Sequence, residues 1–419
     1  MPGFTMKTTH QLARIVLGLI CLTQAEAGNW PGWRGPTGNG ISPEKGLPVK
    51  WSATENVRWK IELPGRGNSS AIVWENRVFL TQSLEAENRR TVVCYDRKTG
   101  KKLWQAGPVY TEKETTHDTN PFCSASPTTD GQRVIAWFGS AGIYCYDMEG
   151  KELWHRDLGK QSHGFGYGAS PVIWGDLCIL NFGPGDRSFI TGLDKKTGQA
   201  VWQNDITKPV LEYEGPFGTY STPVLVGEKG KEILVTTYPK RVVGLDPKTG
   251  KELWSCGGLD QQVISSPVPG DGVVVAMGGF KGNSVAVKLG GEKDVTESHR
   301  LWQNKTTFYT SGVIHEGHLY TMKTAGIAVC VDLQTGKPVW EERLASAEAN
   351  NNTWSSMVLS DGKLYVPNQS GVTFVLKASP KFELLATNSI GGELNNSSLA
   401  LANGDVLMRT HKHLWCFGL

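Results

Sequence analysis

The chain has 419 residues, of which 50 are glycine and 15 are tryptophan, and its formal net charge at neutral pH is +3. A nearly balanced charge argues against a nucleic acid or an acidic membrane surface as a partner. The length suits two or three ordinary domains, or a single all-β repeat domain, which can run this long.

Residues 1–27 have the pattern of a secretory signal peptide. Lys7 and Arg14 give it a positive front, residues 15–22 are apolar, and residues 25–27 form a small-residue cleavage site. The apolar stretch is too short to cross a bilayer, and the motif for lipid attachment is poor. We therefore predict an exported product, periplasmic or secreted, that is soluble and does not span a membrane.

Residues 28–55 are rich in Gly, Pro and Trp and show no period, which predicts an irregular N-terminal arm packed on the main body. They contain the run Asn29-Trp-Pro-Gly-Trp-Arg-Gly-Pro36. Residues 56–63 then have the pattern of a single strand that carries Trp59 and has no hairpin before it.

The main body, residues 56–419, is organised by a repeat with a period of about 40 to 50 residues. In each copy an Asp can bond the backbone of the following turn, and a Gly can take the positive φ of a tight hairpin. A lone hairpin cannot bury a Trp, so each Trp must dock on the next copy. The pattern Asp-x-x-Thr-Gly-x-x-x-Trp covers residues 96–104, 194–202, 246–254 and 332–340, with a shortened copy at 147–154. The Trp residues given this structural role are Trp59, Trp104, Trp154, Trp202, Trp254, Trp302 and Trp340.

A second marker, a pair of small or hydroxyl residues that is often followed by Pro, opens each repeat. Eight openings occur, at residues 69–70, 124–127, 169–171, 221–223, 265–267, 310–312, 355–356 and 397–398. Short strands separated by turns follow each opening, which predicts a four-stranded antiparallel sheet. The last copy lacks a fourth strand, and residues 56–63 can supply it. We therefore predict an all-β fold, an eight-bladed β-propeller closed by the N-terminal strand, because closure removes exposed sheet edges.

The repeat resembles the PQQ-like, tryptophan-docking propeller repeat of quinoprotein dehydrogenases and BamB-like proteins, over roughly residues 56–419. The run from Trp30 to Pro36 is similar to the N-terminal signature of exported propellers of the planctomycete type. In the dehydrogenases that the repeat resembles, PQQ lies at the ring centre, beside a disulfide of adjacent cysteines and a Ca²⁺ bound by Glu, Asn and Asp. A dehydrogenase-like function would imply the same cofactor here. This chain has no adjacent cysteines. We therefore expect no cofactor and no metal site.

In a propeller, the loops before the innermost strands surround the mouth of the central channel, where ligands enter. We expect several side chains on these loops to form one polar, aromatic-lined pocket. The alternative is that these loops are ordinary ordered segments whose polar side chains form hydrogen bonds with the backbone. His117 and His163 lack the short spacing that is typical of a metal site. The candidates are His117, Asp118, Asn120, His163, Tyr167, Glu214, Tyr220, Trp354 and Asn396.

These patterns favour an exported, non-catalytic propeller that acts as a binding or scaffold module. Its partner would be an envelope protein or a small ligand at the channel mouth. The alternative is a PQQ-dependent dehydrogenase of alcohols or sugars, with PQQ and Ca²⁺ as cofactors. A polysaccharide-related binding protein is a third possibility.

Overall fold

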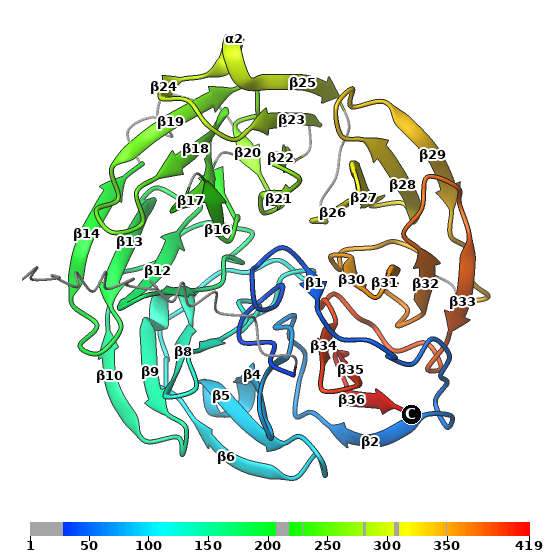
Figure 1. The fold of residues 1–419 in the computed structure, drawn as a ribbon. Helices are drawn as coiled ribbons and strands as arrows, with labels where there is room; N and C mark the ends of the chain where they lie inside the picture. Colours follow the sequence, from blue (N-terminus) through cyan, green and yellow to red (C-terminus); the bar gives the residue numbers. More distant parts are fainter. Residues whose placement is uncertain (1–27, 207–217, 229, 280–281, 306–309, 349) are drawn as a thin grey trace, which may run out of the picture.

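The computed structural model describes residues 28–206, 218–228, 230–279, 282–305, 310–348 and 350–419. Eight antiparallel sheets are arranged around a central axis in this part of the chain (Figure 1). The prediction of an all-β, eight-bladed propeller is therefore confirmed. None of the described helices is long and apolar enough to span a membrane.

Each blade has four strands that follow one another from the channel to the outer edge, and the blades are numbered in chain order. Blade 1 contains β3 (Ile72–Trp74), β4 (Arg77–Leu84), β5 (Arg89–Asp96) and β6 (Lys102–Ala106); blade 2 contains β7 (Thr128–Thr129), β8 (Arg133–Trp137), β9 (Ile143–Asp147) and β10 (Glu152–Arg156). Blade 3 contains β11 (Val172–Trp174), β12 (Leu177–Phe182), β13 (Phe189–Asp194) and β14 (Ala200–Asp205); blade 4 contains β16 (Val224–Glu228), β17 (Lys231–Tyr238), β18 (Arg241–Leu245) and β19 (Glu252–Gly257).

The second half of the ring repeats this order. Blade 5 contains β21 (Val268–Gly270), β22 (Val273–Met277), β23 (Asn283–Lys288) and β25 (Arg300–Lys305); blade 6 contains β26 (Val313–His315), β27 (His318–Lys323), β28 (Ile327–Asp332) and β29 (Pro338–Arg343). Blade 7 contains β30 (Val358–Ser360), β31 (Lys363–Pro367), β32 (Thr373–Lys377) and β33 (Leu384–Asn388); blade 8 contains β34 (Ala400–Ala402), β35 (Asp405–Arg409), β36 (His413–Gly418) and β2 (Val57–Glu62).

Three short pairings lie outside this plan. β1 (Ile41–Ser42) adds a parallel strand to blade 7 at β30, and β24 (Lys293–Asp294) adds one to blade 4 at β19. β15 (Gly218–Thr219) pairs with β20 (Gln262–Val263). The described helical segments are α2 (Thr296–His299) and the 3₁₀ turns Glu85–Glu87 and Gly139–Ala141. Blades 4 and 7 therefore differ from the four-stranded expectation by one strand each.

The ring is closed by the N-terminal strand. β2 pairs antiparallel with β36, so that Trp59 lies opposite Cys416 and Ile61 lies opposite Leu414. Blade 8 thus combines three strands from the end of the chain with one from its beginning (Figure 1). The predicted closure is confirmed, and it removes the sheet edge that β36 would otherwise expose.

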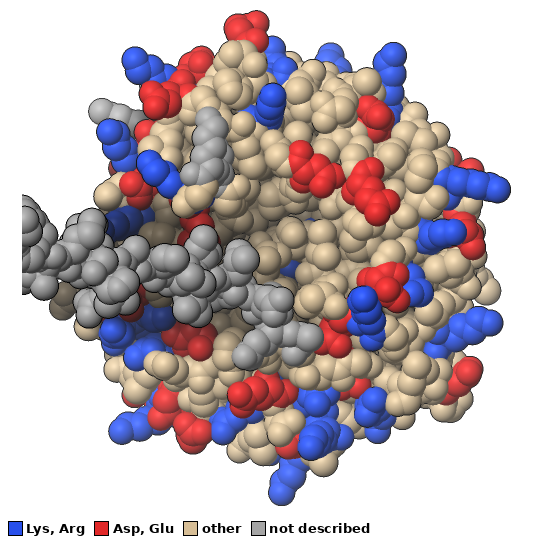
Figure 2. Space-filling view, viewed as in Figure 1, with Lys and Arg blue, Asp and Glu red and all other residues tan. Residues whose placement is uncertain are grey.

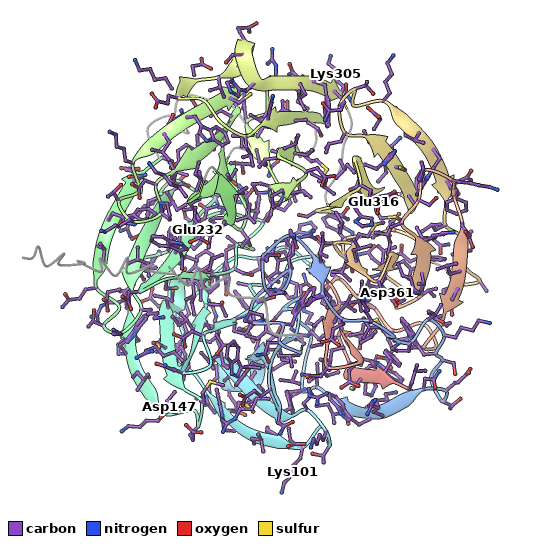
Figure 3. All side chains as sticks on the ribbon, viewed as in Figure 1. Lys101, Asp147, Glu232, Lys305, Glu316 and Asp361 are labelled. Carbon is purple, nitrogen blue, oxygen red and sulfur yellow. The ribbon has the colours of Figure 1, made fainter. Side chains whose placement is uncertain are left out.

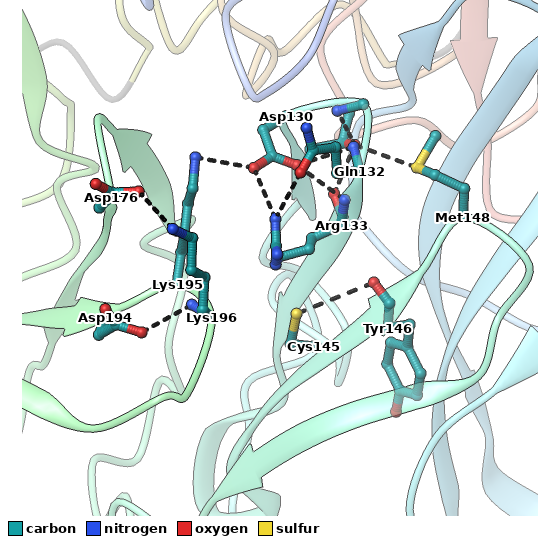
Figure 4. Close-up of polar contacts among 12 residues, drawn as sticks. Asp130, Gln132, Arg133, Cys145, Tyr146, Met148, Asp176, Asp194, Lys195 and Lys196 are labelled. Carbon is teal, nitrogen blue, oxygen red and sulfur yellow. Dashed lines mark hydrogen bonds and ion pairs between the residues drawn. The ribbon is translucent and has the colours of Figure 1, made fainter.

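The repeat motif forms the turn between the third and fourth strands. The Asp194 carboxylate accepts the backbone N–H of Lys196 at 2.9 Å (Figure 4). It also accepts the backbone N–H of Thr197 at 2.8 Å. Gly198 takes a φ of 71°, and a Cβ atom there would lie 2.5 Å from the Trp154 ring of the preceding blade. Glycine is therefore required at this position both by the turn and by the indole that covers it.

The indoles join neighbouring blades. The Trp154 N–H donates to the Lys195 carbonyl at 3.0 Å, and the apolar clusters of the core also bridge adjacent sheets. Trp254 is buried, and its N–H has no partner among the described residues. The other indole N–H groups donate to the next blade as Trp59 to Arg97, Trp104 to Met148, Trp202 to Pro247, Trp302 to Leu333 and Trp340 to Ser379.

Charged side chains concentrate on the turns. Lys101, just before β6, and Asp147, the last residue of β9, lie at the periphery (Figure 3). Glu316 and Asp361, in turns after the innermost strands, lie nearer the axis. Acidic and basic side chains are interspersed around the face shown in Figure 2. Some of these charges link blades: Lys195 of blade 3 lies 3.0 Å from the Asp130 carboxylate of blade 2 (Figure 4).

Candidate functional site

A closed ring of hydrogen bonds surrounds the central channel. The second residue of each opening marker is Ser or Thr, and its hydroxyl accepts the backbone N–H of the equivalent residue in the preceding blade at 2.8–3.0 Å. The last link runs from blade 8 to blade 1. These residues, named here the hydroxyl ring, are Ser70, Ser126, Ser170, Thr222, Ser266, Ser311, Ser356 and Ser398.

The first residue of the marker bonds within its own blade in three copies, whereas in blade 4 the Ser221 hydroxyl donates to the Ser265 carbonyl of the next blade at 2.8 Å. The hydroxyls of Ser265, Thr310 and Ser397 donate to carbonyls of their second strands at 2.7, 3.1 and 2.6 Å. In those three copies one residue of the pair therefore bonds within the blade, and the other bonds the neighbouring blade. The sequence carried a signal for this division, because the second position is a hydroxyl residue in all eight copies whereas the first is alanine in two.

The N-terminal arm closes one end of the channel. Trp30 exchanges two backbone hydrogen bonds of 2.8 Å with Val73, the middle residue of the innermost strand of blade 1. The fully buried Arg34 guanidinium donates to the carbonyls of Ser311 and Met357 at 3.3 and 3.2 Å, and also to that of Gly312. Burial lowers the pKa of Arg34 to about 9, so its charge is kept at neutral pH. Figure 1 shows the arm crossing the centre of this face.

A cavity of about 460 Å³ lies at the channel centre, against the hydroxyl ring. Trp33 of the arm lines both this cavity and the hollow beneath the arm, which places it at the closed end. The opposite end is bordered by the loops that precede the innermost strands. The described lining carries no Asp, Glu, Lys or Arg. Its aromatic members are Trp33, Phe165, Tyr220 and Trp354, and its amides are Asn68, Asn120, Gln262 and Asn396.

Five of the candidate residues predicted from the sequence line this cavity. Asn120 joins two loops, because its amide donates to the carbonyls of Phe165 and Tyr167 at 2.7 and 3.0 Å. Asn396 accepts a hydrogen bond of 2.8 Å from Gln369. The five residues are His117, Asn120, Tyr220, Trp354 and Asn396.

The other candidates lie elsewhere. His163 stands behind the wall, where its Nδ1 is 2.9 Å from the Tyr220 hydroxyl. Burial lowers the pKa of His163 and raises that of Tyr220. Tyr167 is only 2% exposed and packs on Trp137 at 4.6 Å between ring centroids.

Two acidic candidates do not contribute to the described site. The Asp118 side chain is 95% exposed and faces Arg66 at 3.8 Å. It therefore points away from the cavity into solvent. Glu214 falls outside the described residues.

Several lining residues were not singled out from the sequence. Trp33 belongs to the arm, whose Trp-rich run was noted without a role at the channel. Phe165 lies in a loop that was considered, and at 36% it is the most exposed aromatic side chain of the wall. Gln262 lies in β20, outside the repeated strands, and no sequence pattern marks it.

Comparison with known proteins places the chain in a family. A family model described as outer membrane protein assembly factor BamB matches residues 43–183 and 186–418. The chain belongs to the BamB family. BamB of Burkholderia pseudomallei (strain K96243) is 25% identical over 227 residues, which are 52% of this chain and 52% of that protein. The resemblance to PQQ-like, BamB-like propellers is thus confirmed.

The same comparisons find quinoproteins. Quinoprotein ethanol dehydrogenase of Pseudomonas aeruginosa is 24% identical over 306 residues, which are 66% of this chain and 44% of the enzyme. The chain spans about half the length of the curated relatives it matches.

Solved structures agree on the fold. BamB from Moraxella catarrhalis has a TM-score of 0.61 at 17% identity and covers 87% of this chain and 99% of its own. Quinohemoprotein alcohol dehydrogenase from Comamonas testosteroni has a TM-score of 0.69 at 12% identity, with 94% of this chain and 81% of that chain covered. At these identities the likeness to the BamB and dehydrogenase structures shows the fold alone.

The described cavity residues do not fit PQQ with Ca²⁺. PQQ is a tricarboxylate, and burying its charges requires cationic partners, while Ca²⁺ favours carboxylate oxygens. The described lining supplies neither kind of charge. The buried Cys123 lies outside the lining, and burial raises its pKa to about 12. What the described wall offers is aromatic surface, amides and hydroxyls.

Proposed function

We propose that this member of the BamB family is an exported, non-catalytic binding module that takes a small ligand, or a small part of an envelope partner, into the channel cavity. The observation that carries the proposal is a cavity that the arm closes at one end and whose described lining carries no Asp, Glu, Lys or Arg. Its volume of about 460 Å³ lies within the roughly 300–1,000 Å³ of ligand pockets in general. Five of the loop residues predicted to bind a ligand border it.

The closed end supports retention of a ligand rather than passage through the channel. Arg34 and the backbone bonds of Trp30 fix the arm, and Trp33 stands below the hydroxyl ring. A ligand therefore enters and leaves by one mouth. The wall supplies hydrogen bonds and aromatic contacts, and the described lining has no carboxylate, amine or thiol to act on bonds within the ligand.

Filling the cavity tests the proposal. Gly168 lines the cavity, and a Cβ atom there would meet only Tyr220, at 3.9 Å, so Gly168→Leu places its side chain in the cavity without a backbone clash. Gly227→Leu is the matched control, because a Cβ atom at this exposed position of β16 meets nothing within 4 Å. Native mass spectrometry would follow small molecules retained after incubation with an envelope extract. We expect retention by the wild type and the control but not by Gly168→Leu; equal retention by all three would refute the proposal.

The dehydrogenase alternative has its own experiment. Purified protein would be mixed with PQQ and Ca²⁺ and assayed for a cofactor spectrum and dye-linked alcohol oxidation. We expect no saturable uptake. If the wild type took up PQQ and Gly168→Leu abolished this uptake, the dehydrogenase function would be favoured over the binding module.

A further inference from the structure

The charge of the cavity restricts its ligand. A charged group moved from water into an enclosed site loses hydration, and this loss is recovered only if the site offers an opposite charge. The described lining has none, and its one imidazole, that of His117, lies 2.8 Å from the Thr119 hydroxyl. An uncharged ligand therefore fits the cavity better than an anion or a cation.

The hydroxyl ring determines which groups the ligand must carry. Each ring oxygen already accepts one backbone N–H, so its own proton remains for another acceptor. Between described residues, only Ser311 has such an acceptor, the Ser266 carbonyl at 3.4 Å. The ring residues are buried, line the cavity and encircle the channel axis. To accept hydrogen bonds from these hydroxyl groups, the ligand must carry several oxygen atoms. Hydroxyl groups on the ligand match best, because they rotate and can donate as well as accept.

The walls add flat apolar surfaces. Trp33, Trp354 and Tyr220 face the cavity, and Phe165 stands at its rim beside His117, at 5.1 Å between ring centroids. Aromatic faces such as these bury the apolar side of a ligand whose edges are polar. A pyranose ring has this character, because its C–H groups form an apolar face and its hydroxyls surround the edge.

From the absence of charge in the described part of the lining, the ring of hydroxyl donors and the aromatic walls together, we infer that the cavity binds an uncharged sugar, a monosaccharide or the end of a short oligosaccharide. The inference rests on the proposed binding function and names its ligand class. The volume, near the lower end of ligand pockets, limits the ligand to a small number of rings. Phe165 at the rim would contact the sugar as it enters.

Calorimetry on the full chain tests this inference. The probes are glucose, galactose, N-acetylglucosamine and their disaccharides, each beside a charged counterpart: glucuronate, galacturonate or glucosamine. We expect at least one neutral sugar to bind saturably. Its charged counterpart should bind with an affinity that is lower by about tenfold or more. Gly168→Leu should abolish the binding and Gly227→Leu should preserve it.

The rim supplies a second variant that does not disturb the core. Phe165→Ala should weaken binding of the same sugar about tenfold. Leu103→Ala, at an apolar residue on the outer strand β6 that is more exposed than Phe165, should leave it unchanged. Equal binding of neutral and charged sugars, or no effect of Phe165→Ala, would overturn the inference. If no sugar binds but envelope molecules are retained by the wild type and lost in Gly168→Leu, the sugar inference fails and the binding function stands. If neither is retained, both fail.

Discussion

At the level of single residues, the hydroxyl ring gives a buried backbone N–H of every blade its partner. Such a donor costs about 1–3 kcal/mol when it is left without an acceptor in the interior. The ring therefore explains why the second marker position is always Ser or Thr, although the residues that flank it vary.

Replacing one ring hydroxyl should destabilise the propeller. Ser266→Ala removes the acceptor of the Thr222 N–H, which lies 2.8 Å from the hydroxyl oxygen. We expect a loss of about 1–3 kcal/mol in the free energy of unfolding, measured by urea denaturation. Ser298→Ala, in the exposed helix α2, is the control and should change stability by less than about 0.5 kcal/mol. If Ser266→Ala left the free energy of unfolding unchanged, this link of the hydroxyl ring would not contribute to stability.

A half-buried histidine, His411, should make stability depend on pH. The His411 Nε2 lies 3.2 Å from the Asn68 amide oxygen, and burial, with Arg409 and Arg66, lowers the pKa of His411 to about 4. The unfolded value is about 6.5, so the unfolded state binds more protons between these two pH values. This contribution to stability is therefore complete above pH 6.5 and is lost as the pH falls toward 4.

The variant His411→Gln should reduce this dependence. Urea midpoints of both proteins at pH 7 and pH 5 would measure it, and the wild type should lose more stability than the variant over this interval. Carboxylates titrate in both proteins, so the difference between the two isolates the histidine. An equal loss would contradict the assigned pKa.

At the level of elements, the hairpin and its tryptophan work as one unit. The Asp and Thr of the motif shape the turn, and hydrogen bonds from Thr99 hold the pKa of Asp96 below its usual value. The glycine of the turn leaves room for the indole of the preceding blade, as Gly250 does for Trp202. These local relations are why blade number and strand order could be predicted from the sequence.

Two tryptophans allow the indole hydrogen bond to be measured. Trp202 donates to the Pro247 carbonyl at 3.0 Å, whereas the Trp254 N–H has no partner among the described residues. Replacing either residue by Phe removes a similar ring volume, but only Trp202→Phe removes an indole hydrogen bond. We expect Trp202→Phe to cost about 1 kcal/mol more than Trp254→Phe in thermal or urea unfolding. Equal costs would mean that the indoles act by packing alone.

The positions of the site residues were less accessible to prediction. Tyr167 and Tyr220 both lie on loops before innermost strands, yet Tyr167 turns away to pack on Trp137 while Tyr220 lines the cavity. Trp33 reaches the cavity from an arm without a repeat, and Gln262 from a strand outside the blades. A local pattern identifies strands and turns, but which side of a loop faces the axis depends on packing between blades that are distant in sequence.

At the level of the whole molecule, stability depends on closing the ring. β2 covers β36, and the Trp59 indole bonds the Arg97 carbonyl of blade 1 at 2.7 Å, so one strand joins the first and last blades. An uncovered β36 would present an unpaired edge to other chains.

Removing the closing strand should make the chain associate with other copies through the exposed edge of β36. We expect deletion of residues 1–62 to give dimers or aggregates in size-exclusion chromatography with light scattering. Deletion of residues 1–27, which keeps the arm and β2, is the control and should stay monomeric. Addition of a peptide of residues 56–63 should restore the monomer, and a monomeric 63–419 fragment without peptide would refute this role of β2.

The hydroxyl ring also limits how proteins of this architecture can change in size. Its eight links have nearly equal lengths and the same sense, so they form a polygon whose circumference is set by the number of blades. A duplicated or deleted blade would leave this polygon open or strained unless every other link moved. Insertions in loops at the open mouth disturb no link. Divergence among such propellers should therefore accumulate in the mouth loops, which border the proposed ligand cavity, while the number of blades stays constant.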